Sequence, residues 1–291
     1  SLLSGQYSPR HGVYTVANPA RGPAKDRRLV PTDNSRKIPI DKITIAEALK
    51  PAGYVSAAIG KWHVGNDPIE EGFDFAVKKY DIGFKNGHFD KKGEYLTDRF
   101  TNDAVDFITE NKDNPFFLYL AHDAVHTPIQ AKQDIITKYK TKEAEGCHGH
   151  AEYAAMIESV DQSVGKINRT IEDLGLSENT IVIFFSDNGG HGEYTCQTPL
   201  RGGKGMFYEG GIRVPMFAYW PDKIKRNTTC DDPVIGTDFY TTFLELAGAK
   251  RPENYALDGK SIMPLLKGEE SIKRDALYWH FPAYLQSYNG L

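Results

Sequence analysis

The chain has 291 residues, of which 40% are apolar and 25% are charged, and its formal net charge is -4. This is enough apolar material for one sizeable core, so we expect one α/β domain over residues 1–291. The charge argues against a nucleic-acid-binding protein, and lysine runs at 91–92 and 138–142 indicate solvated surfaces. No apolar run is long enough to span a membrane. The three cysteines form no zinc pattern and no obvious disulfide framework.

Apolar runs with β-forming residues alternate with helical patterns along the chain, which is typical of βαβ units and a parallel sheet. The first forty residues, rich in Pro, Arg and Gly, predict an irregular loop. Thr44 and Glu47 have capping-box spacing, which predicts a short helix that ends before Pro51. The remaining pattern predicts strands at 54–59, 116–121, 181–185 and 214–220, and helices at 98–110, 151–174 and 237–246.

The helix predicted at 151–174 has the clearest apolar face. Its apolar residues recur at helical spacing, and Gly175 suits the position after the last turn. We expect this stripe to pack in the core: Tyr153, Met156, Ile157, Val160, Val164, Ile167, Ile171 and Leu174.

Polar side chains follow three of the predicted strands at the point where each strand ends. Lys61 and His63 follow the first, His126 follows the second, and Asp187 with Asn188 follows the third. Because the carboxyl ends of parallel strands meet at one edge of a sheet, we expect these residues to form one site.

The third strand end carries the ligands expected for a hard cation. The Asp187 carboxylate and the Asn188 amide oxygen suit Ca²⁺ or Mg²⁺, and Lys204 can reach an anion held by the metal. Asp-Asn-Gly is also ordinary turn chemistry, so this segment alone leaves both interpretations open.

Five segments of the sequence resemble a known enzyme family. Residues 60–65 read GKWHVG, 124–128 read AVHTP, 186–190 read SDNGG, 200–215 read LRGGKGMFYEGGIRVP, and 257–266 begin LDGKS and end PLL. These motifs and their order are similar to those of formylglycine-dependent sulfatases of the alkaline-phosphatase-like superfamily, in the N-acetylgalactosamine-sulfatase-like or arylsulfatase-like branch.

This resemblance implies a mostly parallel central sheet with helices on both faces. It also implies two features that the sequence lacks, an Asp-Asp metal-binding pair and a CxPSR motif whose cysteine matures to formylglycine. We therefore expect 1–291 to be a sulfatase catalytic domain that is incomplete at both ends. The nucleophile and the N-terminal strand would lie upstream of Ser1, and a C-terminal subdomain would follow Leu291.

The resemblance also implies roles for individual residues in a sulfuric ester hydrolase. Asp187 and Asn188 would bind the metal, while Lys61 and Lys204 would hold the sulfate group. Either Lys204 or His126 would protonate the leaving oxygen, and His63 would assist the formylglycine hydroxyl in expelling sulfate. Four further polar residues have no motif position. We expect His122 and His191 at best to support the site residues or to face the substrate, and the role of Arg10 and His11 is open.

The implied substrate is a sulfate ester, either a small molecule or a sulfated carbohydrate. Two alternatives stay open, namely a phosphodiesterase or phosphonate hydrolase on the same scaffold, and a non-catalytic anion-binding fragment. By resemblance, the protein would be periplasmic or secreted in a bacterium, and lysosomal or secreted in an animal.

Overall fold

A computed structural model describes residues 1–16, 18–269 and 271–283. It contains two compact units: unit 1 comprises Ser1–Ser56, His63–Asp74 and Trp220–Leu291, and unit 2 comprises Ala57–Trp62 and Phe75–Tyr219. A single catalytic domain over 1–291 therefore stays a prediction. The expectation about the chain end at Leu291 lies outside the described residues.

Unit 2 holds most of the regular structure. Strand β1 (Val55–Gly60) is the middle strand of the order β2-β1-β3, with β2 at Phe75–Val77 and β3 at Phe116–Ala121. β1 and β2 are parallel, with Ala58 opposite Ala76. A second, antiparallel pair joins β4 (Val182–Phe185) to β5 (Met216–Tyr219). The predicted α/β class is confirmed, and all four predicted strands are present within two residues of their expected bounds.

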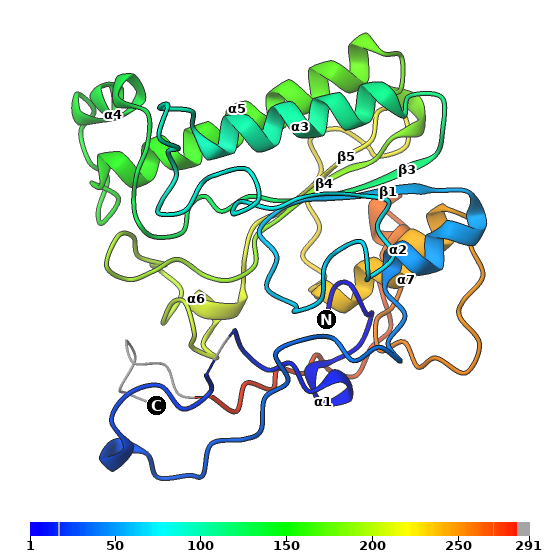
Figure 1. The fold of residues 1–291 in the computed structure, drawn as a ribbon, viewed down its shortest axis with the longest axis horizontal. Helices are drawn as coiled ribbons and strands as arrows, with labels where there is room; N and C mark the ends of the chain where they lie inside the picture. Colours follow the sequence, from blue (N-terminus) through cyan, green and yellow to red (C-terminus); the bar gives the residue numbers. More distant parts are fainter. Residues whose placement is uncertain (17, 270, 284–291) are drawn as a thin grey trace. The chain divides into compact units, whose positions relative to one another are not determined.

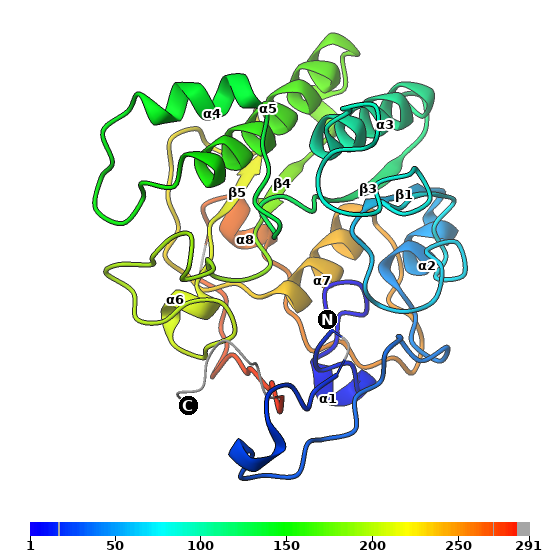
Figure 2. The ribbon, with the colours of Figure 1, turned by 60° about the vertical axis from the view of Figure 1, so that its left-hand side comes forward.

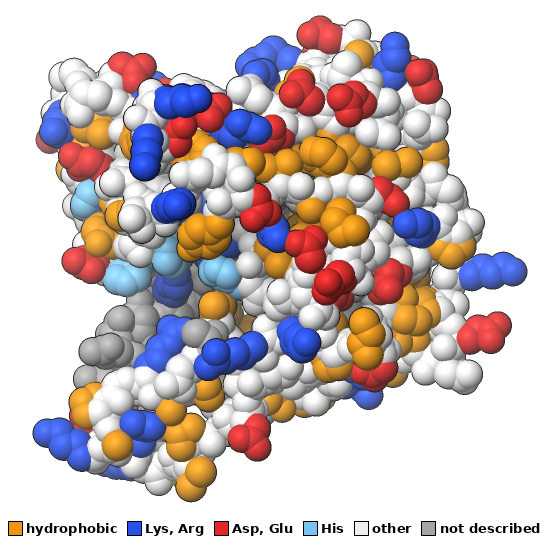
Figure 3. Space-filling model, in the orientation of Figure 1, with side chains coloured by type: hydrophobic (Ala, Val, Ile, Leu, Met, Phe, Trp, Pro, Cys, Tyr) orange, Lys and Arg blue, Asp and Glu red, His pale blue; other side chains and the backbone are white. Residues whose placement is uncertain are grey.

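Three helices of unit 2 lie together on one face of β3 and β4, namely α3 (Leu96–Glu110), α4 (Gln133–Lys140) and α5 (Ala151–Asp173) (Figures 1 and 2). α4 packs on α5 through a small apolar cluster that includes Ile135, Ile136 and Met156. Neither α4 nor β2 was predicted from the sequence. Figure 3 shows acidic and basic side chains mixed over these helices, as expected for a solvated surface.

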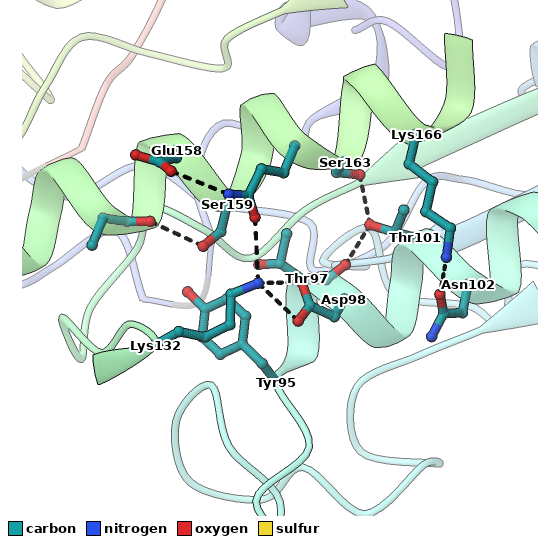
Figure 4. Close-up of polar contacts among 12 residues, drawn as sticks. Tyr95, Thr97, Asp98, Thr101, Asn102, Lys132, Glu158, Ser159, Ser163 and Lys166 are labelled. Carbon is teal, nitrogen blue, oxygen red and sulfur yellow. Dashed lines mark hydrogen bonds and ion pairs between the residues drawn. The ribbon is translucent and has the colours of Figure 1, made fainter. Parts of the chain in front are cut away.

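The contact between α3 and α5 is polar as well as apolar (Figure 4). The Thr101 hydroxyl donates to Ser163 Oγ at 2.6 Å, and Lys166 Nζ donates to Asn102 Oδ1 at 2.7 Å. Lys132 also pairs with Asp98 at 3.0 Å. The Thr101–Ser163 bond satisfies two buried hydroxyl groups, so they cost little on burial, whereas the two lysine pairs are partly or fully exposed.

Three of the eight residues in the predicted stripe of α5 are buried, four are half-buried and one is exposed. Met156, Ile167 and Ile171 are buried as expected, but Ile157 is 50% exposed. The buried row instead runs at four-residue spacing through Ala155, Ser159 and Ser163. Small and hydroxyl-bearing residues let α3 approach closely, and a pattern of large apolar residues does not detect that packing.

Unit 1 contains shorter helices: α1 (Ser8–His11), α2 (Ile45–Leu49), α7 (Gly236–Leu246) and α8 (Met263–Leu266). Turns of 3-10 helix occupy Ala24–Asp26 and Lys50–Ala52 in unit 1 and Ser177–Asn179 in unit 2, where α6 spans Glu209–Ile212. The predicted capping box is confirmed, because Thr44 accepts from the Glu47 N–H and Glu47 accepts from the Thr44 N–H.

A buried carboxylate organises the C-terminal part of unit 1. Asp238 is fully buried, and it accepts from Arg274 Nη2, the Lys260 N–H and the Ile235 N–H at 2.9 Å each. Charge-assisted bonds of this kind compensate the cost of burying the charge. This bonding assigns a structural part to the 257–266 segment that the family resemblance included.

Candidate active site

Lys61 lies where two neighbouring strands of unit 2 end together. Its N–H donates to the Ala121 carbonyl at 2.7 Å, across from the last residue of β3. Gly60 makes this approach possible, because a Cβ at that position would lie 2.0 Å from Ala121 O and its φ is +114°. The ends of β1 and β3 therefore meet at one edge, as predicted.

His126 is positioned by the backbone of its own loop. Its N–H donates to Asp123 O at 2.8 Å, and its Nδ1–H donates to Thr127 O at 2.9 Å. Asp123 in turn pairs with Lys79 at 3.0 Å in a largely buried ion pair. The Nδ1–H contact leaves Nε2 as the ring atom available to a ligand.

Two of the predicted lysines act electrostatically on the predicted His126. Burial lowers the pKa of His126, and the positive charges of Lys204 and Lys61 lower it further, whereas the Thr127 carbonyl opposes them. Two lysines that act electrostatically on one imidazole concentrate positive charge in this part of unit 2. The charges of Lys61 and Lys204 therefore both act on His126, although the three residues are far apart in the sequence.

The segment after β4 joins the proposed metal ligands to Lys204. The Lys204 N–H donates to Gly190 O at 3.0 Å, and the Gly189 N–H donates to Gly211 O at 3.0 Å. A Cβ on Gly189 would lie 1.8 Å from Gly210 O, so no larger residue fits this close approach of two backbones. Close backbone contacts at Gly189 and Gly190 therefore hold the segment just after Asp187 against the segment that contains Lys204.

The oxygen atoms of Asp187 and Asn188 are the ligand type that a hard cation prefers. Asn188 Nδ2 donates to Gly189 O at 3.0 Å, which turns Oδ1 the other way as an acceptor. Ca²⁺ prefers about six to eight oxygen ligands, so one carboxylate and one amide are only part of a site. The other metal-like group in the described residues, Cys147, His148 and Cys196, offers no thiolate because its cysteines form a disulfide.

His88 is a second histidine at this place, beside His126, and no sequence pattern indicated it. Its side chain is 1% exposed, and its Nε2–H donates to His126 O at 2.9 Å. Burial lowers the pKa of His88, and the charges of Lys79 and Lys61 add to this effect. A neutral His88 therefore holds the carbonyl of the residue whose ring lies beside the lysines.

His122, for which we expected at best a supporting or substrate-facing role, faces the helices instead. Its Nε2 lies 3.0 Å from Ser163 Oγ on α5, and burial lowers its pKa to about 4. It is a neutral, structural histidine under the helix layer.

Three other residues that the sequence singled out belong to unit 1. Arg10 Nε donates to Asp258 at 2.8 Å, and His11 is 4% exposed, with its pKa lowered to about 4 by burial. The ion pair of Arg10 with Asp258 and the burial of His11 explain these two residues structurally. His63 is exposed, and its role in the reaction stays a prediction because it lies outside unit 2.

The expectation that the cysteines form no disulfide framework was wrong. Cys147 and Cys196 form a disulfide across a sequence separation of 49 residues, with a Cα–Cα distance of 5.9 Å, and Cys230 is free and exposed. Cysteines in two loops far apart in sequence show no spacing pattern, since only the fold brings them together.

A family model named Sulfatase matches residues 1–249. The chain belongs to the sulfatase family. A sulfatase of Formosa agariphila is 32% identical over 99% of this chain, and the dog N-acetylgalactosamine-6-sulfatase is 31% identical over 96% of it. The chain spans 66% and 58% of the lengths of these two sulfatases.

A solved structure also has a similar fold. Ps i-CgsB, in complex with k-i-k-neocarrahexaose, superposes with a TM-score of 0.75 at 32% identity. The match covers 92% of this chain and 64% of that protein. Within the described residues, no sulfatase helix has the length and apolar character needed to cross a bilayer.

Proposed function

We propose that the sulfatase hydrolyses a sulfate ester of a carbohydrate. The observation that carries this proposal is the positive cluster of Lys61 and Lys204 around His126, joined through the Gly190 backbone to the oxygen ligands Asp187 and Asn188. Sulfate is a tetrahedral anion, so cations and a hard metal are the groups that bind it. The names of the relatives, which include N-acetylgalactosamine-6-sulfatase, support a sugar as the alcohol part.

In the proposed reaction, the bond between sulfur and the sugar oxygen breaks, and a bond between sulfur and the attacking oxygen forms. Asp187 and Asn188 would hold a metal, Ca²⁺ or Mg²⁺, that would supply positive charge for the sulfate oxygens, and a formylglycine would supply the attacking hydroxyl. Lys61 and Lys204 bind the remaining sulfate oxygens. The sugar oxygen leaves with its electron pair and needs a proton.

Lys204 is the better proton donor of the two that the sequence offered. The lowered pKa of His126 favours the neutral ring, whose one N–H is already donated to Thr127 O. A neutral His126 therefore offers an acceptor atom, Nε2, to the substrate. His63 keeps its proposed part in the expulsion of sulfate from the formylglycine.

The disulfide supports a location outside the reducing cytosol. Disulfides persist in secreted, periplasmic and lumenal proteins, and Cys147–Cys196 is of that kind. We propose the periplasm, the exterior or the lysosome, according to the source.

Turnover by a completed enzyme tests this function. None of the three cysteines lies in a CxPSR motif, so the 291-residue chain alone should not turn over an aryl sulfate. The same chain preceded by a matured CxPSR segment should release sulfate faster than phosphate from matched aryl esters. Turnover by the chain alone would contradict the formylglycine mechanism, and a preference for the phosphate ester would favour a phosphohydrolase.

Calcium titration by calorimetry tests the metal ligands separately. With Asp187 and Asn188 as its only predicted ligands, the 291-residue chain should bind Ca²⁺ weakly. Submicromolar affinity that persists in Asp187→Ala would mean that other residues form the metal site.

A further inference from the structure

Two loops of unit 2 are held together beside the proposed metal ligands. The Cys147–Cys196 disulfide joins the loop before α5 to the loop after β4. His148 and Thr195 are the chain neighbours of the two cysteines, and His148 Nδ1 lies 3.2 Å from Thr195 Oγ1. A covalent link and an adjacent polar contact fix the two loops relative to each other.

Three rings from these loops and the start of α5 gather around the Tyr194 ring. The His150 ring meets Tyr194 edge-on at 5.2 Å, the Tyr153 ring stacks at 6.5 Å with planes 12° apart, and the His191 ring lies at 5.4 Å. We call Tyr194, His150, Tyr153 and His191 the Tyr194 platform. All four side chains are only half-buried, so the platform keeps a surface. Figure 3 shows histidine side chains gathered on this face of unit 2 between α4 and α6.

The platform is close to the site of the proposed reaction. His191 follows Asn188 by three residues, and the backbone of Gly190 between them accepts from the Lys204 N–H. Burial raises the pKa of Tyr153, and the negative charge of Asp187 raises it further, so the Asp187 carboxylate acts on this ring. A ligand whose sulfate lies at Asp187 and Lys204 would extend over these rings.

The chemistry of the platform suits an uncharged sugar ring. Tyrosine faces offer flat apolar area to the C–H face of a pyranose, while phenol and imidazole edges donate and accept hydrogen bonds with hydroxyls. Rings fixed by a disulfide and by mutual contact lose little further freedom when a ligand binds. A site for a second sulfate would instead need lysine or arginine, and none belongs to this ring cluster.

We propose that the Tyr194 platform binds the sugar unit next to the sulfated one, so that the protein recognises an oligosaccharide. This proposal rests on the proposed function for the position of the sulfate. It predicts a dependence on chain length that a simple sulfate pocket lacks.

Binding of unsulfated sugar tests the platform without any turnover. The 291-residue chain is mixed with desulfated carrageenan tetrasaccharide, or with unsulfated chondroitin tetrasaccharide, and contact is measured by saturation-transfer NMR. We expect binding of at least one probe, weakened about tenfold in Tyr194→Ala. Tyr219→Ala is the matched control, because Tyr219 is 46% exposed and pairs with Val182 at the far end of β4 from Asp187.

Each outcome decides the matter. Binding that is lost in Tyr194→Ala and in His191→Ala, but kept in Tyr219→Ala, supports the platform. Absence of binding to both probes, or equal binding in all variants, overturns it. Circular dichroism checks that each variant is folded, and Tyr194→Phe, which keeps the ring, should retain most of the affinity.

Kinetics of the completed enzyme separate this proposal from the function on which it rests. Tyr194→Ala should raise KM for a sulfated tetrasaccharide about tenfold and leave kcat/KM for a small aryl sulfate unchanged. An equal loss on both substrates would overturn the platform while the sulfatase function stands. If the wild-type enzyme cleaves no sulfate ester, the function fails, and the NMR result alone decides the platform.

Discussion

The helix layer and the loop layer of unit 2 hold their polar groups in different ways. Between α3 and α5, side chains bond to side chains, as in Thr101 with Ser163 and Asn102 with Lys166 (Figure 4). In the loop layer at 186–211, the main contacts are hydrogen bonds between backbone groups at closely packed glycines, as between the Gly189 N–H and Gly211 O. Backbone hydrogen bonds and close glycine contacts thus shape the loop that carries Lys204 and follows Asp187.

This difference separates structural polar residues from functional ones. A side chain engaged with another side chain of the fold is fixed, like Ser163, and contributes stability. A side chain carried by a glycine-shaped turn can be exchanged without unfolding the protein, provided that the turn survives. The two layers should therefore respond differently to mutation, and the changes below test this from the largest expected effect to the smallest.

Removal of the disulfide should cost the most stability in the loop layer. Cys147→Ser with Cys196→Ser should lower the free energy of unfolding by about 2–4 kcal/mol, because a cross-link limits the unfolded chain. Denaturant unfolding measures this loss. The free, exposed Cys230 provides the control, since Cys230→Ser should change nothing. Equal stability of the double variant and the wild type would mean that the loops are held without the link.

Lys204→Ala should lower turnover about a hundredfold in the completed enzyme, because it removes one charged group that stabilises the transition state. Its melting temperature should stay unchanged. The exposed Lys112 at the end of α3 is a suitable control, and Lys112→Ala should affect neither quantity. Normal turnover with a lowered melting temperature would make Lys204 a structural residue and remove it from the anion site.

Two glycines in the same loop give a matched test of the backbone argument. Gly189→Ala should destabilise the protein by about 1–3 kcal/mol, because its new methyl group would overlap a neighbouring backbone. That methyl group would lie 1.8 Å from Gly210 O, whereas a Cβ on Gly192 meets nothing within 4 Å. Gly192→Ala should therefore be neutral in thermal unfolding. Similar melting temperatures for both variants would show that the turn is looser than described.

The helix layer should weaken at acidic pH through His122. Burial lowers its folded pKa to about 4, so the unfolded chain, with a pKa near the ordinary 6.5, binds the proton more tightly. Its contribution to stability is complete above pH ~6.5 and is lost progressively as the pH falls toward ~4. Between pH ~7.5 and ~5.5 this amounts to about 1 kcal/mol, and urea unfolding of His122→Gln should show a correspondingly flatter pH dependence. An unchanged pH dependence would assign the effect to another group, such as His11.

Local signals in the sequence were sufficient for most elements. The strand at Phe116–Ala121 matched its prediction, and the Thr44–Glu47 capping box gave the start of α2. Those signals come from neighbouring residues, so no tertiary information is needed. The same approach failed for α4, whose apolar positions are few and whose lysines indicated only a solvated face.

The sequence by itself determined the family, the alternation of strands and helices, and the residue types of an anion and metal site. Only the tertiary structure decided which of these residues meet. It showed that the charges of Lys61 and Lys204 act on His126, turned His122 toward Ser163, and revealed His88 and the Cys147–Cys196 link. The physical reason is that motif and periodicity report on neighbours along the chain, whereas ring contacts, close glycine approaches and disulfides depend on segments that only folding brings within a few ångströms.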